Sequence, residues 1–525
     1  MRPDIQRTSY DEVPYVSHPF RQTHPDRLAT VGSLFGMQPP PIDRCRVLEV
    51  GCAAGENLLP MACRLPQSEF VGVDLSEVQI AAAQSFAKDV DARNLRFVQM
   101  DLCELPSDLG EFDYIIAHGV YSWISISAQE SLLNVCRTRL APQGIGYVSY
   151  NTYPGWHMRG MVRDMMNYRV RALASPTERI QQSRELLQFL ANSVQAENSA
   201  YSILLNSELS LLSRQNDSYL FHEHLEEHNS PLYFHQFADR AASAGLQYLG
   251  DADFSMMFIE RLPDQVEATL RRVATTLIEA EQYMDFVRNR MFRQTLLCRD
   301  SVALDRSLPF ARILPLFIAS QTRAESSPTE MATDGEMKFR SGDSIASTSD
   351  PLTKAALLCL GESWPRRLSF PDLLDTARRR LAGEGQRHSV EPDDTQTLAQ
   401  ALLGCYANGH IELSMQPSSC ETKVNEKPVT SHLARRQSAK ASFVTNEFHT
   451  SVQLHDHERY LLRMLDGDHD LLQLTNGLVQ LVLGGTLPLP PNVESVSNAD
   501  QLRRFVERAV AESLKRFANY GLLVG

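Results

Sequence analysis

An acidic residue, two glycines and a second polar residue lie close together in the sequence RVLEVGCAAGENLLP, which begins at Arg46. An apolar run followed by glycines and then a helix often holds a nucleotide-like ligand, because glycine lets the backbone approach the ligand closely. Three chemistries compete for such a loop. It could bind the phosphates of ATP, the pyrophosphate of a dinucleotide, or a ligand without phosphate.

The spacing of the loop disfavours both phosphate ligands. A P-loop needs lysine followed by serine or threonine after its glycines, whereas Glu56 and Asn57 follow Gly55. A dinucleotide fingerprint that began at Gly51 would need glycines where Ala53 and Glu56 stand. A glutamate at the start of the helix would also repel a pyrophosphate, which requires positive potential there.

A third pattern fits the loop better. Glu49 precedes Gly51, Ala53 and Gly55, which resembles the acid and G-x-G-x-G loop of class I S-adenosylmethionine-dependent methyltransferases. That cofactor has no phosphate, and its amino group and sulfonium are both positive, so neighbouring carboxylates suit it. Alanine is tolerable in place of the middle glycine where its φ is negative, and we therefore expect a negative φ at Ala53.

Further polar residues follow the later apolar runs. Asp74 ends the second run, where an acid can accept hydrogen bonds from ribose hydroxyls, and Asp101 ends the third, the usual place for an adenine contact in such enzymes. The segment AHGVYSWI follows the fourth run, where cofactor and substrate would meet. The resemblance implies this set of cofactor-binding residues: Tyr15, Glu49, Gly51, Cys52, Ala53, Gly55, Asn57, Asp74, Leu75, Asp101, Leu102, His118 and Gly119.

The elements that must position these residues alternate between strand and helix. RVLEV, EFVGVD, LRFVQMD, FDYIIAHG and GIGYVSYN are expected strands, and Ser76 is an expected N-cap of the helix after the second. The pattern predicts an α/β fold with a Rossmann-like, doubly wound, mostly parallel sheet. All the candidate acids then meet at the carboxyl edge of the sheet, where open α/β sheets bind ligands.

Breaks in this alternation predict the domain boundaries. We expect an N-terminal arm (1–45) that covers the cofactor site, and a methyltransferase core formed by 46–156 together with 231–262. A helical insertion (157–230) interrupts the core. A helical and linker region (263–345) with at most one short strand follows, and then two winged-helix-like α+β modules, 346–416 and 440–525.

Longer segments resemble one bacterial family. SYDEVPYVSHPFRQTHPDRLATVGSLFGM, YNTYPGWHMRGMVRDMM, PLYFHQFADRAASAGLQYLGDADF and RYLLRMLDGDHDLLQL are similar to methyltransferases that carry a methyltransferase regulatory domain, among them rickettsial protein-lysine methyltransferases. The resemblance implies S-adenosylmethionine as cofactor, often a homodimer, and a protein or peptide substrate that presents lysine. The last segment also resembles small winged-helix modules that hold peptides; a helix-turn-helix core without a ligand is the alternative.

Candidate catalytic residues lie after the fourth and fifth strands. Tyr150, Tyr153 and Trp156 could bind a lysine ammonium through their ring faces, or could simply pack beneath the insertion. His118 could accept a proton, or could line the cofactor pocket. In FHEHLEEH, which begins at Phe221, the histidine spacing differs from H-E-x-x-H, so we expect a hydrogen-bonded junction between the insertion and the sheet, and no metal.

Composition restricts the partners. The formal net charge of -13 disfavours nucleic acid as a partner, since phosphate contacts need a basic face. Nine cysteines without a C-x-x-C pair suggest neither zinc nor disulfides. No apolar run approaches the ~18 residues of a membrane span, so we expect no membrane insertion and a cytoplasmic location. Two other functions remain open: methylation of a small molecule or natural product, and a non-catalytic regulator that binds cofactor or peptide.

Overall fold

The computed structural model describes residues 9–15, 17–194, 199–325, 335–342, 344–382, 393–488 and 499–525, and the chain divides into two compact units. The first comprises Met1–His18 and Met37–Leu304, and the second Pro19–Gly36 and Asp305–Gly525. The expectation of one arm over 1–45 is therefore wrong for 19–36. There, α2 (Pro25–Leu34) belongs to the second unit, where Asp26 accepts hydrogen bonds from Ser414 Oγ and Met415 N, both at 2.6 Å.

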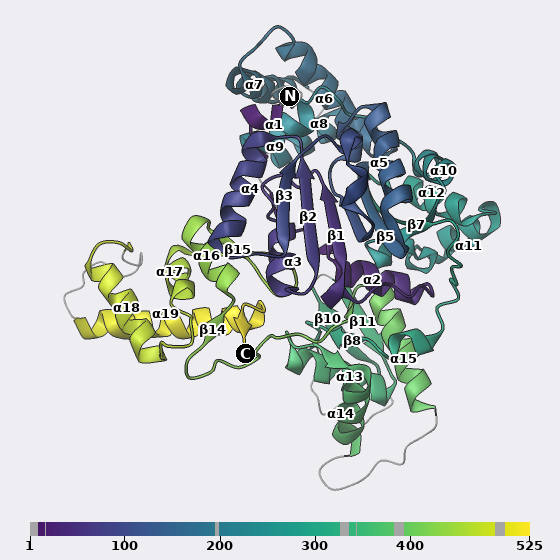
Figure 1. The fold of residues 1–525 in the computed structure, drawn as a ribbon. Helices are drawn as coiled ribbons and strands as arrows, with labels where there is room; N and C mark the ends of the chain where they lie inside the picture. The colour runs from purple at the N-terminus through teal and green to yellow at the C-terminus, as the bar shows by residue number, and fades with distance from the viewer. Residues whose placement is uncertain are drawn as a thin grey trace. The chain divides into compact units, whose positions relative to one another are not determined.

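A seven-stranded sheet forms the centre of the first unit, in the order β3-β2-β1-β4-β5-β7-β6 (Figure 1). All neighbouring pairs are parallel except those of β7, which runs antiparallel to both β5 and β6. This confirms the predicted Rossmann-like, mostly parallel α/β fold. The strands are β1 (Arg46–Val50), β2 (Glu69–Asp74), β3 (Leu95–Gln99), β4 (Phe112–Ala117), β5 (Leu140–Asn151), β6 (Leu246–Asp251) and β7 (Phe292–Arg299).

The central strands read as nearly continuous apolar runs because helices cover the sheet. Val47, Leu48 and Ile115 are completely buried. Ser76 caps α4 as predicted, since its hydroxyl accepts a hydrogen bond from Gln79 N at 3.2 Å. The helices that alternate with the strands or follow them are α3 (Leu58–Arg64), α4 (Glu77–Asp89), α5 (Ile126–Arg139) and α10 (Phe234–Ser243).

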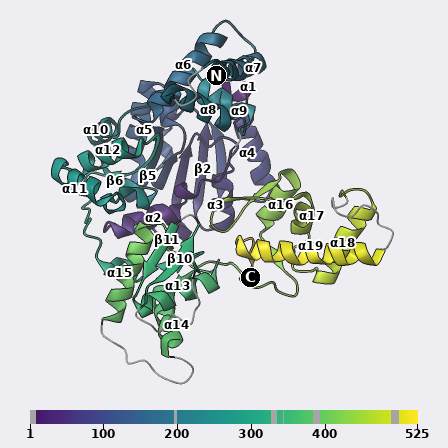
Figure 2. The same cartoon turned by 180° about the vertical axis from the view of Figure 1, so that it is seen from behind.

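The seventh strand lies in a range that we expected to be helical and linker. Residues 263–345 include α11 (Asp264–Val273) and α12 (Leu277–Arg288), but then β7, whose residues pair with β5 from Gly146↔Leu297 to Asn151↔Phe292. The core therefore continues past the predicted end at residue 262. Figure 2 shows α10, α11 and α12 beside this β5–β6 side of the sheet.

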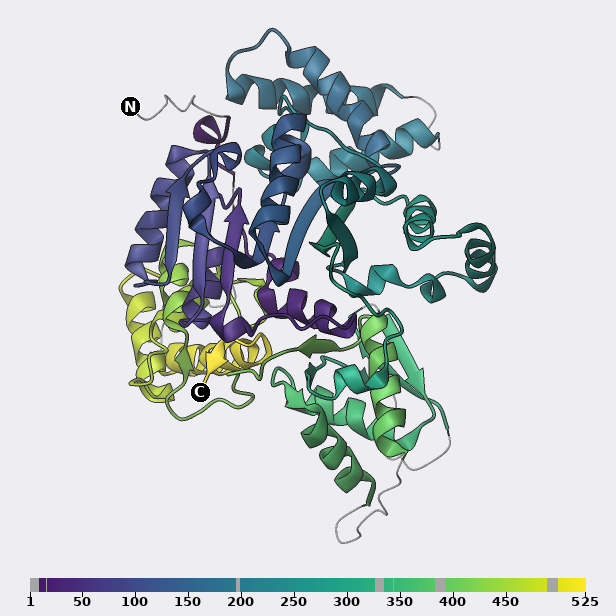
Figure 3. The same cartoon turned by 45° about the vertical axis from the view of Figure 1, so that its right-hand side comes forward.

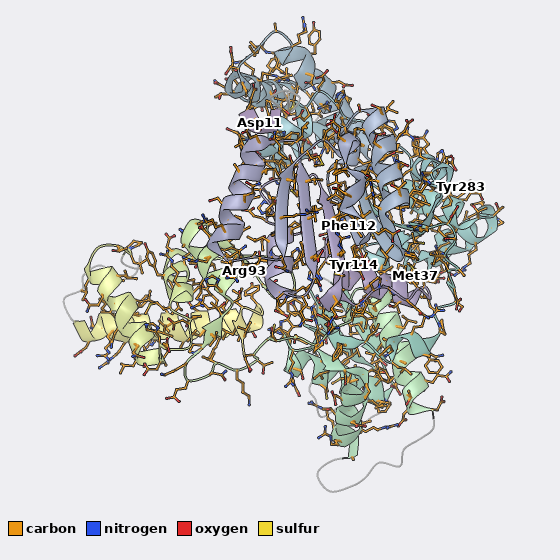
Figure 4. The ribbon with its side chains drawn as sticks, in the orientation of Figure 1. Asp11, Met37, Arg93, Phe112, Tyr114 and Tyr283 are labelled. Carbon is orange, nitrogen blue, oxygen red and sulfur yellow. The ribbon has the colours of Figure 1, made fainter. Side chains whose placement is uncertain are left out.

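Four helices occupy most of 157–230: α6 (Trp156–Val170), α7 (Pro176–Ser193), α8 (Ala200–Leu212) and α9 (Asp217–His224). They have an apolar core of their own, which includes Met166, Leu187, Leu205 and Phe221. Figure 3 shows these helices over the upper ends of the strands. The short α1 (Ser9–Glu12) lies at the same end, where Figure 4 labels Asp11; Arg93, just before β3, marks the opposite end.

Two small sheets of the second unit lie before residue 420, and the first of them falls largely where the sequence predicted a linker. β9 (Arg323–Ala324), β10 (Met337–Ser341) and β11 (Ser344–Thr348) form one antiparallel sheet, so the expectation of at most one short strand was wrong. In the next, β8 (Phe317–Ala319) pairs with β12 (Leu368–Ser369) and β13 (Glu412–Ser414). The helices of this part are α13 (Pro351–Ser363), α14 (Phe370–Ala382) and α15 (Asp394–Ala407).

The C-terminal module begins earlier than the predicted residue 440. Its strand β14 (Val429–Thr430) pairs with β17 (Leu523–Val524), and a hairpin joins β15 (Phe443–Thr445) to β16 (Ser451–Gln453). Its helices are α16 (His432–Lys440), α17 (Asp456–Arg463), α18 (Leu471–Leu483) and α19 (Ala499–Asn519). Within the described part of the chain, no helix has the length and apolarity to cross a bilayer.

Candidate active site

The loop after β1 turns through left-handed backbone three times. The φ angles of Gly51, Ala53 and Gly55 are 72°, 46° and 78°. A Cβ atom on Gly51 would lie 2.4 Å from Val120 Cγ2, and one on Gly55 would lie 2.3 Å from Phe97 Cζ, so both positions require glycine. The negative φ expected at Ala53 is wrong: alanine adopts the conformation of the glycine that it replaces, at some cost in backbone strain.

The acid at the end of β2 holds this loop in place. Asp74 Oδ2 accepts a hydrogen bond from Ala53 N at 2.8 Å, and Oδ1 accepts one from Ser76 N at 2.9 Å. Burial raises the pKa of Asp74, while these two N–H donors oppose the rise. Asp74 therefore ties the β1 loop to the start of α4 at the carboxyl edge of the sheet.

Glu49 lies inside the same edge with one oxygen unsatisfied. Glu49 is only 3% exposed, and its Oε1 accepts a hydrogen bond from Asn57 Nδ2 at 2.6 Å. Its other oxygen, Oε2, has no hydrogen-bond partner among the described residues. Burial raises the pKa of Glu49 to about 8. A buried carboxylate with a free oxygen matches a ligand that brings an ammonium group, because the new donor would offset the desolvation.

The acid after β3 starts a turn of 3-10 helix. Asp101 Oδ1 accepts a hydrogen bond from Cys103 N at 2.8 Å, and Leu102 is half-buried in that turn. Leu75, which follows β2, is 39% exposed. Since β2 and β3 are paired neighbours, Asp74 to Gln99 being in register, these residues lie at adjoining strand ends.

His118, after β4, is held as a neutral ring. Its Nδ1 lies 2.8 Å from Tyr147 Oη, and the next amide, Gly119 N, donates to Ser149 Oγ at 2.7 Å. Burial lowers the pKa of His118 to about 3. A group with that pKa takes up almost no protons at neutral pH, which contradicts the sequence-based candidacy of His118 as a proton acceptor.

Two of the three aromatic candidates belong to the core. Tyr150 is 1% exposed, stacks on Phe237 at 4.2 Å between ring centroids, and hydrogen-bonds with Thr295. Trp156 is 3% exposed and packs edge-on against Trp123. These positions contradict direct contact of either ring with a substrate.

Tyr153 is the aromatic candidate that remains partly accessible. Its ring stacks on His157 at 3.9 Å between centroids and lies 5.3 Å from that of Tyr233. Its backbone is fixed from two sides, since Tyr153 N donates to Leu232 O and Gly155 N donates to Arg290 O. The turn that carries Tyr153 is therefore built by the segment after the insertion.

The histidine-rich sequence of α9 joins the insertion to the N-terminal arm. His222 Nδ1 lies 2.8 Å from Glu226 Oε1, and its Nε2 lies 2.5 Å from Val13 O. The ring of Tyr10 stacks on His222 at 4.4 Å, and Tyr15 packs edge-on at 5.7 Å. The expected junction with the sheet is thus a junction with the arm. Among the described residues, no group of three His, Cys, Asp or Glu side chains is placed to hold a metal.

Three family models match the chain. Residues 47–144 match a methyltransferase domain, 216–299 a predicted methyltransferase regulatory domain, and 426–522 a PKMT C-terminal winged-helix domain. The fold and the phosphate-free glycine loop thus define a class I methyltransferase, and the match confirms the predicted winged helix at the C-terminus.

Similar proteins cover nearly the whole chain. The uncharacterized protein RP789 of Rickettsia prowazekii (strain Madrid E) is 34% identical over 98% of this chain and 93% of its own length. The structure of PKMT2 from Rickettsia typhi in complex with AdoHcy is 32% identical, covers 98% of this chain and 100% of that one, and has a TM-score of 0.87. The chain belongs to this family of methyltransferases with a regulatory and a PKMT winged-helix domain. It is an S-adenosylmethionine-dependent methyltransferase, as predicted.

Proposed function

We propose that the protein transfers a methyl group from S-adenosylmethionine to the ε-amine of lysine in a protein substrate. The observation that carries this proposal is the similarity to PKMT2 along 98% of the chain, including the PKMT winged-helix domain at residues 426–522. The name of that relative denotes a protein-lysine methyltransferase. Enzymes that share only the methyltransferase domain with this chain have acceptors as different as a tRNA guanine and trans-aconitate, so the core alone supports no acceptor.

We infer that three acids hold the cofactor. The free oxygen of Glu49 suits the methionine amino group, Asp74 the ribose hydroxyls, and Asp101 the adenine amino group. The cofactor would lie along the backbone of Gly51, Cys52, Ala53, Gly55 and Gly119. Asn57 would orient Glu49, and Leu75 and Leu102 would lie beside the adenine. His118 would line the pocket, and Tyr15 would cover it. When bound, S-adenosylmethionine supplies an electrophilic methyl group. What the chain must add is position and a dry environment, which together provide most of the acceleration in such a displacement.

The lysine acceptor sets one further requirement. An ε-amine has a pKa of about 10.4 in water, so at neutral pH it must lose a proton before its lone pair can attack. His118 is too weak a base for this step, and the proton acceptor must be found elsewhere in the site.

Methyl transfer from tritium-labelled S-adenosylmethionine tests the proposal. The pure protein is incubated with a bacterial lysate, and the products are divided into a protein fraction and a small-molecule fraction. We expect label in the protein fraction, and methyl-lysine after acid hydrolysis of that fraction. Label confined to small molecules would refute lysine as acceptor. The Glu49→Gln variant serves as the control for label that does not depend on the cofactor site.

A further inference from the structure

Glu223 is a carboxylate of the helical insertion to which the proposed cofactor site assigns no role. It lies in α9 and is partly buried, and among the described residues its side chain makes no hydrogen bond. The N-terminal arm connects α9 to the cofactor loop. Tyr10 stacks on His222, which precedes Glu223, and the next residue of the arm, Asp11, accepts a hydrogen bond from Ser76 Oγ at 2.6 Å, while Ser76 N donates to Asp74.

Ionisable groups of α6, α8, α9 and the arm interact electrostatically with Glu223. They are Arg159 and Arg163 of α6, Glu208 of α8, Tyr219 and His222 of α9, and Tyr10 and Tyr15 of the arm. Burial raises the pKa of Glu223 to about 7, and the positive charges, Arg159 first, oppose this rise.

The two arginines have other partners. Arg159 Nε lies 3.3 Å from Glu208 Oε1, and Arg159 also donates to Tyr219 Oη. Arg163 Nη2 donates to the backbone carbonyls of Glu226 and Glu227. Since neither arginine forms an ion pair with Glu223, this carboxylate can accept a cation from outside.

The rings beside Glu223 are arranged for an alkylammonium group. Tyr10 is stacked on His222 and Tyr15 meets the same imidazole edge-on, so both tyrosines are fixed on the α9 side of the arm. Tyr219 adds a third half-buried ring from α9 itself. Aromatic rings contact the methylenes of a lysine side chain and attract its cation, while a carboxylate supplies the charge-assisted hydrogen bond.

We propose that Glu223 binds the ε-ammonium group of the acceptor lysine, with Tyr10 and Tyr15 beside the alkyl chain. This inference rests on the proposed lysine acceptor. The ammonium gives one proton to the Glu223 carboxylate, and the neutral amine then forms an N–C bond to the methyl carbon. The C–S bond of the cofactor breaks as that bond forms, and its electron pair stays on sulfur. Glu223 afterwards releases the proton to water.

Binding of a lysine side-chain analogue tests Glu223 without turnover. Butylammonium and its uncharged counterpart butanol are titrated calorimetrically into the complex of the protein with S-adenosylhomocysteine. We expect butylammonium to bind more tightly than butanol to the natural protein, and Glu223→Gln to remove that preference. Equal binding of butylammonium by the natural protein and Glu223→Gln, or no preference over butanol in the natural protein, would overturn the inference. Affinity for S-adenosylhomocysteine shows that the variant is folded.

Turnover on poly-L-lysine gives a second readout. Glu223→Gln should raise the KM for the polymer and lower kcat/KM about 100-fold, with the KM for S-adenosylmethionine unchanged. The rise in kcat/KM as pH increases through about 7 should vanish, because only the ionised carboxylate accepts the proton. Glu227→Gln, an exposed neighbour, is the matched control. Methylation of small molecules alone, with the butylammonium preference intact, would refute the protein substrate but not the amine site.

Discussion

Glu49 should lower the stability of the ligand-free protein and strengthen the binding of the cofactor. Its carboxyl group is nearly inaccessible, and burial raises its pKa from 4.5 to about 8. The folded state therefore keeps a proton between these two values that the unfolded state has lost, and stability falls as pH rises through that range. Each pH unit lowers the free energy of unfolding by about 1.4 kcal/mol, so between pH 5 and pH 7 the protein loses about 3 kcal/mol of stability.

Glu49→Gln removes this loss and retains an oxygen for Asn57. We expect the free energy of unfolding of the variant, relative to that of the natural protein, to rise by about 3 kcal/mol between pH 5 and pH 7. Urea unfolding of the ligand-free proteins followed by circular dichroism measures it. Asp74 also has a raised pKa, but it is present in both proteins and cancels in the difference.

The same substitution should weaken cofactor binding. Losing a charge-assisted hydrogen bond costs about 1.5–3 kcal/mol, which corresponds to a roughly 10- to 100-fold higher Kd for S-adenosylmethionine. In the natural protein, affinity should increase with pH up to about 8, since Glu49 must lose its proton to pair with the amino group, and the variant should lack that increase. Parallel pH dependences of stability in the two proteins, with equal cofactor affinity, would refute the assignment of Glu49.

Three further outcomes follow from the site. Ala53→Val should lower the free energy of unfolding by about 2 kcal/mol and abolish cofactor binding, because a β-branched residue at a φ of 46° is strained. Ala53→Gly should bind the cofactor normally, and calorimetric titration compares the two variants. Tyr150→Phe should cost about 1 kcal/mol in urea unfolding, through the lost bond to Thr295, with kcat unchanged; a 100-fold lower kcat would place the ring in the site instead. His118→Asn should leave the shape of the pH–rate profile between pH 5 and pH 8 unchanged, because the pKa of His118 is about 3; loss of a limb there would contradict a neutral ring.

Local signals in the sequence were sufficient for strands β1 to β5 and for the acids at the edge of the sheet, but not for β7. A parallel sheet brings the carboxyl ends of its strands together, so Asp74 could be placed near the β1 loop from the strand pattern alone. The conformation of Ala53 could not, because its amide is held by a long-range contact, the hydrogen bond to Asp74 Oδ2 from 21 positions away.

The aromatic residues after β5 show a second limit. Residues along a strand alternate between its two faces, so Tyr147 and Ser149 face His118 while Tyr150 faces Phe237. The sequence shows the alternation but not which face holds the site. Contacts of the arm with α9 could not be predicted from the sequence either. Val13 and His222 are 209 positions apart, and neither residue type indicates that the other is its partner.

The segment that matches the regulatory-domain model is part of the catalytic fold. Residues 216–299 include β6 and β7, and β7 lies between β5 and β6 in the sheet. The same segment supplies Leu232 O and Arg290 O, which hold the turn of Tyr153, and His222, which holds the arm. A change in this segment therefore reaches the active site through strand pairing and hydrogen bonds. Removing it would leave the edge of β5 unpaired, so regulation by a separable domain is inconsistent with this topology.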